Sequence, residues 1–388
     1  MPSFPSPSLQ SLTTGLVVAV VGYFSSFPIV LEGLRAVGAS EAQAASGLMA
    51  AAIAMGLAGI ALSLFTRQPV SVAWSTPGAA LLAISAMPEA GFSAAVGAFL
   101  FAALLVVICG LFRPLGRLAA RLPAPLAQAM LAGVLLPLCL APFQAMPLQP
   151  AFVLPIFATW AVMLHLNRLF AIPVTVLVTA LLIATLSDLT PLEDAPLFGA
   201  PVIVHPTFDL AALIGLGLPL FIVTMATQNI PGFAVLRGHG YSAPPVPLLS
   251  GVGLFSVLSA PFGAHSTCLA AITAEMCANP DSHPDPARRY WTAVSAGCFY
   301  CLFGVFAGWL TLFSGLAPPM VISALAGLAL AGVMVNAALS ALSPPDSRDA
   351  ALVTFLVTAS GVTFLGLGGA VWGLLIGGIF WAAKSLRR

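Results

Sequence analysis

The hydrophobic positions of this chain fall into long apolar runs separated by short polar breaks, from Leu12 to Trp381. Runs of about 20 residues match a hydrocarbon core about 30 Å thick, and each predicts one membrane-spanning helix. Barrel strands are excluded, because they need only about ten residues each. The pattern predicts an all-α polytopic membrane protein with about fourteen transmembrane segments. Their approximate bounds are 12–30, 44–65, 70–87, 91–111, 125–141, 150–167, 170–187, 210–236, 246–260, 262–277, 290–313, 317–342, 350–366 and 368–384.

Small, polar and helix-breaking residues interrupt the third and the tenth of these segments. The two stretches read "QPVSVAWSTPGAALLAISAM" and "SAPFGAHSTCLAAITAEM". We expect each to be a short strand followed by a half-helix, and the half-helices to begin near Pro77 and near Ser266. Extended backbone at this depth is tolerated only where it lines a cavity within the protein. The two broken spans therefore predict a binding cavity near the middle of the membrane.

Two pairs of stretches resemble each other across the halves of the chain. "FPIVLEGLRAVGAS" compares with "IPGFAVLRGHGYS", and Ser75 to Met87 compares with Ser266 to Met276. About seven spans separate the members of each pair, and an odd number inverts the second copy, as in many secondary transporters. The comparison predicts two inverted repeats of seven spans each, residues 1–190 and 205–388. The alternative, that membrane helices rich in small residues simply look alike, stays open.

Composition agrees with a chain that lies almost wholly in lipid. Of its 388 residues, 60% are hydrophobic and 6% are charged, against about a quarter charged in an ordinary soluble domain. We therefore expect membrane lipid around the protein and no separate soluble domain. The net charge is +1 and no basic patch is present, so the sequence gives no indication of nucleic acid binding.

The distribution of basic residues predicts the orientation. If the N-terminus is cytoplasmic, twelve of the 13 Lys and Arg residues lie on the cytoplasmic side, and Arg35 alone lies outside. This arrangement obeys the positive-inside rule. The first residues, "MPSFPSPSLQ", lack the basic region of a cleavable signal, so the first apolar segment is expected to be a permanent span. Both termini are then cytoplasmic.

The residues at the breaks are polar but uncharged, which favours an anionic substrate. Helix N-termini carry partial positive charge and free N–H groups, whereas a buried carboxylate would repel an anion. The eighth segment adds two amides to this set. The substrate-binding candidates are Ser75, Thr76, Pro77, Gln228, Asn229, Gly263, His265, Ser266 and Thr267.

Aromatic residues near these positions indicate a flat apolar substrate body. Tyr23 and Phe24 are the main candidates for this wall, and packing between helices or against lipid is the alternative for each of them. Further aromatic residues in the same segments are Phe27, Trp74, Phe233 and Phe262.

His265 is the first candidate for carrying a proton with the substrate anion. It lies at a broken span, and an unperturbed imidazole titrates near pH 6.5. The alternative is a neutral histidine that bonds a backbone carbonyl freed by the break. Glu275 is the second candidate, although ten residues of helix place it about 15 Å further along, where an interfacial carboxylate is the alternative.

The buried polar residues contain no nucleophile with its base and no set of metal ligands. The sequence therefore predicts no enzyme activity, no catalytic residue, no metal and no cofactor.

Three separated motifs, "TQNIPGFAVLRGHGY", "APFGAH" followed by "LAAIT", and "HPDPARRYW", closely resemble the benzoate membrane transport (BenE) family. The resemblance covers nearly the whole chain. It implies proton-coupled uptake of benzoate across a bacterial inner membrane, and a distant similarity to nucleobase–cation symporters and to anion exchangers with the same seven-plus-seven fold.

The resemblance also implies a division into a core domain and a gate domain, with substrate held between the third and tenth half-helices. The core domain would comprise about 11–112 and 208–313, and the gate domain about 123–188 and 317–384. Nucleobase symporters typically carry glutamates where this chain has Gln228 and His265, and the loss of these charges fits a carboxylate substrate. Ser266 and Thr267 stand where the family often has glycine and asparagine, which leaves the exact aromatic acid open.

The sequence thus predicts a secondary transporter for benzoate or a related aromatic carboxylate, coupled to protons and working by alternating access. Three alternatives stay open: a passive anion channel or facilitator, a carrier of a different small organic anion, and a carrier of a nucleobase-like solute. A homodimer and a monomer are both compatible with the sequence.

Overall fold

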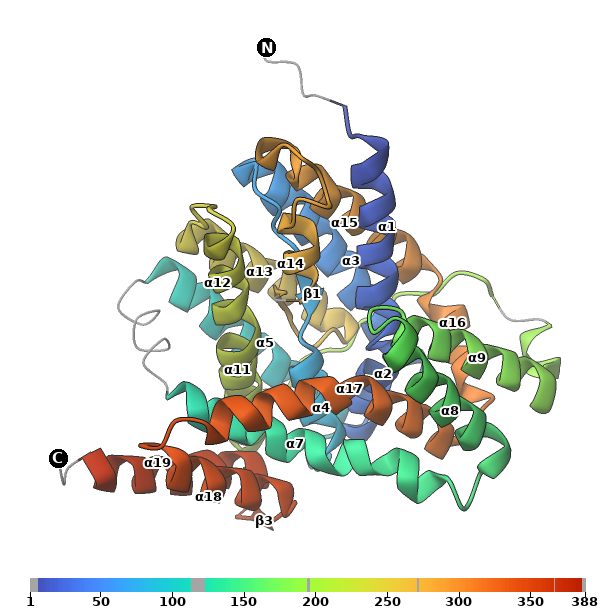
Figure 1. Ribbon diagram of the computed structural model, residues 1–388. Coiled ribbons are helices and arrows are strands. Elements are labelled where there is room, and N and C mark those ends of the chain that lie inside the picture. The colour runs from blue at the N-terminus through green and yellow to red at the C-terminus, as the bar shows by residue number, and fades with distance from the viewer. Residues whose placement is uncertain (1–5, 113–122, 194–195, 271, 366, 386–388) are drawn as a thin grey trace.

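The computed structural model describes residues 6–112, 123–193, 196–270, 272–365 and 367–385. Helices make up most of the described chain (Figure 1). In the first half they are α1 (Leu9–Phe24), α2 (Phe27–Ala36), α3 (Glu41–Thr66), α4 (Thr76–Ala83), α5 (Phe92–Leu111), α7 (Ala124–Ala145), α8 (Pro150–Leu166), α9 (Ala171–Leu186) and the 3₁₀ turn η1 (Thr190–Leu192).

The helices of the second half are interrupted more often. They are α10 (Leu210–Ala212), η2 (Leu213–Gly217), α11 (Leu218–Thr224), η3 (Met225–Asn229), α12 (Ile230–Gly238), α13 (Pro245–Ser259), η4 (Ala260–Phe262), α14 (Ile272–Ala278), η5 (Pro286–Arg288), α15 (Tyr290–Val305), α16 (Ala307–Gly315), α17 (Pro319–Leu342), α18 (Arg348–Ala359) and α19 (Gly369–Ser385). The described residues also form four short strands: β1 (Val72–Trp74), β2 (Thr267–Leu269), β3 (Thr363–Phe364) and β4 (Leu367–Gly368).

Length and apolar composition identify membrane-spanning helices. Within the described residues, seven helices are long and apolar enough to cross a membrane, or eight if α15 and α16, bent by 56° at Phe306, count as one span. Three further apolar helices are shorter: α8, α9 and α19. The structure confirms an all-α polytopic membrane protein, whereas the count of fourteen spans stays a prediction.

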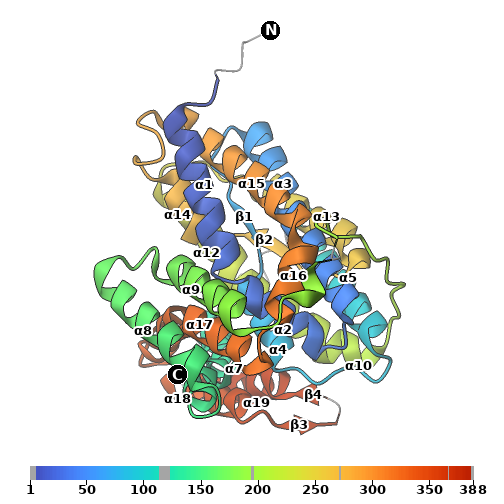
Figure 2. The same cartoon turned by 90° about the vertical axis from the view of Figure 1, so that its right-hand side faces the viewer.

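The helices lie in two groups. α1, α3, α13, α14 and α15 stand together in the upper part of Figure 1, while α7, α17, α18 and α19 run across below them. α3 packs along α15, and α17 packs along α7. In the view turned by 90°, α8 and α9 lie beside the lower group (Figure 2).

The two broken spans meet at the centre of the fold. β1 pairs antiparallel with β2, with Val72 opposite Leu269, Ala73 opposite Cys268 and Trp74 opposite Thr267. α4 follows β1 directly, and α14 follows β2 after a short break. This arrangement confirms the prediction that each broken span is a short strand followed by a half-helix.

The start of the first half-helix agrees with its prediction, and the start of the second does not. α4 begins at Thr76 with Pro77 in its first turn, where proline is favoured because its missing N–H needs no partner there. The described part of α14 begins at Ile272, so the predicted start near Ser266 is wrong. Residues 267–269, directly after Ser266, form β2 instead, because their backbone groups pair with β1.

Prolines shape the eighth span. Two π-helical segments, η2 and η3, are each followed within two residues by a proline, Pro219 or Pro231. Proline removes one backbone donor and clashes with the preceding turn, which favours a local widening of the helix. Gln228 and Asn229 lie in the second widened segment.

Close packing of α3 against α15 depends on Gly56 and Gly297. A Cβ atom on Gly56 would lie 2.5 Å from the carbonyl oxygen of Gly297, and one on Gly297 would lie 2.6 Å from the carbonyl oxygen of Gly56. We expect Gly56→Ala to force the two helices apart and to lower the free energy of unfolding by about 1–3 kcal/mol. Thermal unfolding of the purified protein in detergent measures this loss.

Gly332 in α17 provides the control, because a Cβ there would meet nothing within 4 Å. Gly332→Ala should leave the unfolding temperature unchanged or raise it slightly. Equal unfolding temperatures for Gly56→Ala and Gly332→Ala would contradict the close helix crossing.

Candidate functional site

Ser75 connects the two broken spans beyond the strands themselves. Its N–H donates to the carbonyl oxygen of Ser266 at 3.0 Å, and its hydroxyl accepts from the N–H of Gly78, which caps α4. The hydroxyl of Thr224 in α11 donates to the same oxygen at 2.8 Å. Ser75 thus joins β1, α4, the β2 strand region and the eighth span at one buried point.

His265 lies directly beside this point. Its Nε2 atom is 3.0 Å from the carbonyl oxygen of Ser75, and the side chain is 1% exposed. Because a carbonyl oxygen only accepts, Nε2 carries the hydrogen and Nδ1 is left as a bare acceptor. Nδ1 has no hydrogen-bond partner among the described residues, and neither does the buried hydroxyl of Ser266.

Two further polar candidates, one on the eighth span and one on β2, bond to backbone groups. The N–H of Leu269 donates to Oδ1 of Asn229 at 2.9 Å, and Nδ2 of Asn229 lies 3.3 Å from the sulfur of Met225. The hydroxyl of Thr267 donates to the carbonyl oxygen of Val252 at 2.8 Å. Asn229 and Thr267 therefore hold the strand region in place.

Gln228 and Thr76 differ from these two residues. Both side chains are half-buried, and neither makes a side-chain hydrogen bond with the rest of the described chain. Both remain able to donate to a ligand. Pro77 is buried in the first turn of α4, and Gly263 ends η4 with φ of +91°, a conformation that favours glycine.

The predicted aromatic wall is partly assembled. Tyr23 is fully buried, and its ring lies 5.0 Å from that of Trp74, 5.3 Å from that of Phe24 and 5.4 Å from that of Phe303. The Tyr23 hydroxyl has no partner among the described residues. Phe303 was absent from the predicted set; its only signal in the sequence is its place in an aromatic-rich span.

Two of the remaining aromatic candidates lie apart from this cluster. Phe233 packs under the guanidinium of Arg237, 5.7 Å from ring centroid to Cζ, and Phe262 belongs to η4. Phe27 joins Tyr23, at 6.1 Å between ring centroids.

Glu275, the second candidate for a proton carrier, is 54% exposed. One of its carboxylate oxygens lies 3.0 Å from Nε2 of His239, which follows α12. The structure therefore does not bring Glu275 together with His265 in the buried centre.

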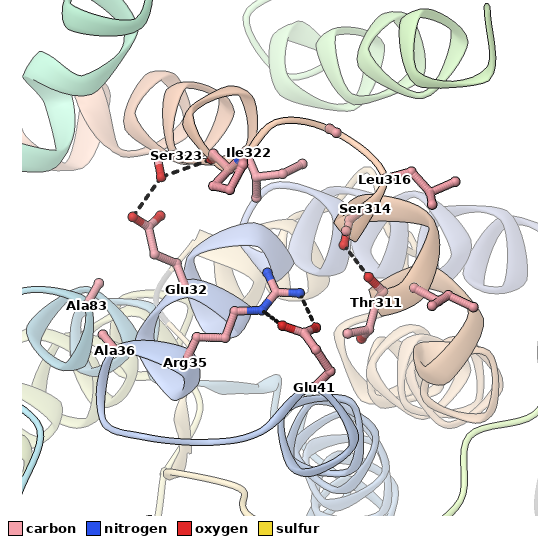
Figure 3. A pocket seen from close by; sticks show the side chains of 14 residues that line it. Glu32, Arg35, Ala36, Glu41, Ala83, Thr311, Ser314, Leu316, Ile322 and Ser323 are labelled. Atoms are coloured by element: carbon pink, nitrogen blue, oxygen red, sulfur yellow. Dashed lines mark hydrogen bonds and ion pairs between the residues drawn. The ribbon is translucent and has the colours of Figure 1, made fainter. Parts of the chain in front are cut away.

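A separate cavity of about 690 Å³ lies between α17 and a group formed by α2, α4, α16 and the start of α3. Glu32, Arg35 and Glu41 are its charged lining residues (Figure 3). Glu32 was missed at the level of sequence, because the first span was ended at residue 30 while the helical chain continues to Ala36. A carboxylate inside an apolar helix is the signal that could have found it.

Comparison with known families identifies the chain. The family described as benzoate membrane transport protein (BenE) matches residues 6–383. The chain belongs to the benzoate membrane transport family. This membership confirms the resemblance carried by the three sequence motifs.

Two relatives in the family match this chain over nearly the full length of both proteins. The inner membrane protein YdcO of Escherichia coli (strain K12) is 36% identical over 361 residues, covering 93% of this chain and 91% of that protein. The benzoate membrane transport protein of Acinetobacter baylyi (strain ATCC 33305 / BD413 / ADP1) is 30% identical over 355 residues, covering 92% and 90%.

Two solved structures with the same fold are a bicarbonate transporter and an anion transporter by name. The transmembrane domain of the cyanobacterial bicarbonate transporter BicA has a TM-score of 0.63 at 16% identity, over 95% of this chain and 97% of that one. The murine anion transporter Slc26a9 in its inward-facing state has a TM-score of 0.67 at 14% identity, over 99% and 69%. Family and fold together make this chain a membrane transport protein and not an enzyme.

The hydrogen bond from Leu269 to Asn229 yields a stability prediction. Asn229→Leu keeps the branching of the side chain at Cγ but leaves a buried backbone N–H of β2 without its acceptor, at a cost of about 1–3 kcal/mol. We expect a lower unfolding temperature in detergent. Ile230→Leu, one residue along and 38% exposed, is the control and should unfold like the wild type. An unchanged unfolding temperature for Asn229→Leu would show that this contact does not support β2.

Proposed function

We propose that this chain is a secondary transporter that imports benzoate or a related aromatic carboxylate together with protons. The observation that carries the proposal is the buried centre at β1 and β2, where His265 and Ser266 present polar side-chain atoms that have no partner among the described residues. Family membership and the printed name of the Acinetobacter relative support the substrate class.

The charge distribution around the centre supports an anion. The stretches 69–87, 225–236 and 260–274, which contain β1, α4, η3 and β2, hold no Asp or Glu. A carboxylate there would meet hydroxyl and amide donors from Ser266, Thr76 and Gln228 and the N-terminal end of α4. No negatively charged side chain in these stretches would repel it. Asn229 and Thr267 would act indirectly, by fixing the strand region.

The aromatic cluster around Tyr23 supports a flat apolar substrate body. Tyr23 and Phe24 contact Trp74 or Phe303 and form a packed aromatic surface beside β1. Aromatic rings favour offset or edge contacts with one another. A benzoate ring would bind against this surface with its carboxylate toward Ser266.

The proton is assigned to His265. Its bare Nδ1 can accept a proton while Nε2 stays bonded to the carbonyl oxygen of Ser75. The imidazolium that forms would offset the charge of the substrate anion. Glu275, which pairs with His239 at an exposed position, would pass the proton to the aqueous phase.

Alternating access would arise from relative motion of the two helix groups. In this proposal the core domain comprises about 11–112 and 208–313, the gate domain about 123–188 and 317–384, and the two halves 1–190 and 205–388 are inverted repeats of seven spans. The antiparallel pairing of β1 with β2 supports this symmetry. Both termini are assigned to the cytoplasmic side of the bacterial inner membrane, the compartment named for the Escherichia coli relative.

Uptake of radiolabelled benzoate by proteoliposomes tests the function. Because neutral benzoic acid crosses lipid unaided, the quantity to measure is the initial rate above that of protein-free vesicles, with the membrane potential clamped at zero. We expect an acidic exterior to raise this rate several-fold. A passive anion facilitator would instead respond to an inside-positive potential and not to the proton gradient, and a rate equal to that of protein-free vesicles would contradict both.

Substitution of His265 tests the proton carrier. In His265→Gln the amide can still donate to the carbonyl oxygen of Ser75, but it cannot titrate. We expect exchange of labelled for unlabelled benzoate to continue, while stimulation by the proton gradient is lost. His205→Gln, which changes an exposed histidine outside the buried centre, is the control and should keep the stimulation. Wild-type pH dependence in His265→Gln would exclude His265 as the carrier.

A further inference from the structure

The cavity between α2 and α17 contains a second buried acid. Glu32 belongs to the apolar helical stretch Leu9–Ala36, and one of its carboxylate oxygens accepts from the hydroxyl of Ser323 at 2.9 Å. Its other oxygen, Oε2, is buried and has no partner among the described residues. Figure 3 shows Glu32 and Ser323 in direct contact at the cavity wall, from two different helices.

The nearest basic side chain is already engaged. Arg35 donates to both carboxylate oxygens of Glu41, from Nε at 2.9 Å and from a terminal nitrogen at 2.6 Å. The Glu41 side chain is 70% exposed, whereas that of Arg35 is 27% exposed. Arg35 therefore neutralises the charge of the exposed Glu41. The hydroxyl of Ser323, which is uncharged, is left as the donor to Glu32.

No other ionisable group faces Glu32 from the elements around it, within the lining that the structure describes. α4 contributes Ala83, and α16 and α17 contribute hydroxyls and apolar groups. The one ionisable side chain of α1 is Tyr23, which packs against Trp74. With Glu32 ionised, two carboxylates and one guanidinium give this cavity a net charge of −1.

We propose that Glu32 is a proton-binding site of the transport cycle, an inference that rests on the proposed proton-coupled function. An ionised carboxyl that is buried with one oxygen unsatisfied is costly, and taking up a proton from water in the cavity turns it into a neutral acid. The cavity then has no net charge and no longer repels an approaching carboxylate. Protonation at Glu32 and entry of the anion thereby favour each other.

The hydrogen bond with Ser323 couples protonation of Glu32 to α17, which belongs to the lower group of helices. Ser323 lies on α17, and Glu32 lies on α2. Protonation changes Glu32 from an acceptor of the Ser323 hydroxyl into a group that can also donate. The proton therefore alters a contact between two elements that alternating access would move relative to each other.

The experiment compares Glu32→Gln with Ser323→Ala and Glu89→Gln in proteoliposomes. Glu32→Gln keeps the size and the hydrogen bond of a protonated acid but cannot titrate. It should keep benzoate exchange and lose the several-fold stimulation of uptake by an acidic exterior. Ser323→Ala should keep the stimulation, with the midpoint of its pH profile at higher pH because the ionised acid has lost its donor. Glu89→Gln, an exposed acid outside the cavity, should behave like the wild type.

A spectroscopic measurement gives a readout that does not depend on transport. Infrared difference spectra between acidic and alkaline pH should show, in the wild type and in Glu89→Gln, the high-frequency carbonyl band of a buried protonated carboxylic acid, separate from the band of the exposed acids. The band should be missing in Glu32→Gln.

Three results would overturn the inference. They are wild-type gradient stimulation in Glu32→Gln, loss of exchange and stimulation together in a Glu32→Gln protein that unfolds at the wild-type temperature, and an unchanged infrared band. Absence of any protein-dependent benzoate flux in the wild type would instead reject the proposed function, and the infrared band would still report whether Glu32 titrates.

Discussion

The structure depends on one constraint: extended backbone inside a membrane must find hydrogen-bond partners within the protein. β1 and β2 meet this constraint by pairing with each other. Side chains complete the pairing where the strands end, since Asn229 accepts from Leu269 and His265 contacts the carbonyl oxygen of Ser75. The polar residues of the broken spans are therefore first of all partners for backbone, and what remains unpaired among them is available to a ligand.

This distinction separates two kinds of polar residue that look alike in the sequence. Asn229 and Thr267 use their side chains to hold β2. The hydroxyl of Ser266 and Nδ1 of His265 are buried without partners in the described chain. Gln228 and Asn229 are adjacent in one π-helical segment, yet only Asn229 is bonded to the strand. Sequence alone predicted both as substrate ligands, because no spacing rule distinguishes a side chain that bonds backbone from one that faces a cavity.

More of the fold than of the candidate site could be predicted from the sequence. Apolar runs predicted the helices, and Pro77 with its neighbours located the first break, because a proline in the first turn has a fixed local consequence. The start of α14 was predicted too early because sequence similarity aligned Ser266 with Ser75, which directly precedes α4. In the structure the backbones of these two residues are instead hydrogen-bonded to each other beside the paired strands. Glu32 was missed because the apolar run was ended too early, and its contact with Ser323 joins positions 291 residues apart.

The central claim is that the anion binds where the two broken spans cross. Its most direct test is to locate 4-iodobenzoate bound to the protein, by the anomalous scattering of iodine in crystals. We expect the iodine beside the Tyr23 and Phe24 rings and the carboxylate within hydrogen-bond distance of Ser266. An iodine found in the cavity at Glu32 alone, or no bound iodobenzoate at the crossing of β1 and β2, would contradict this account.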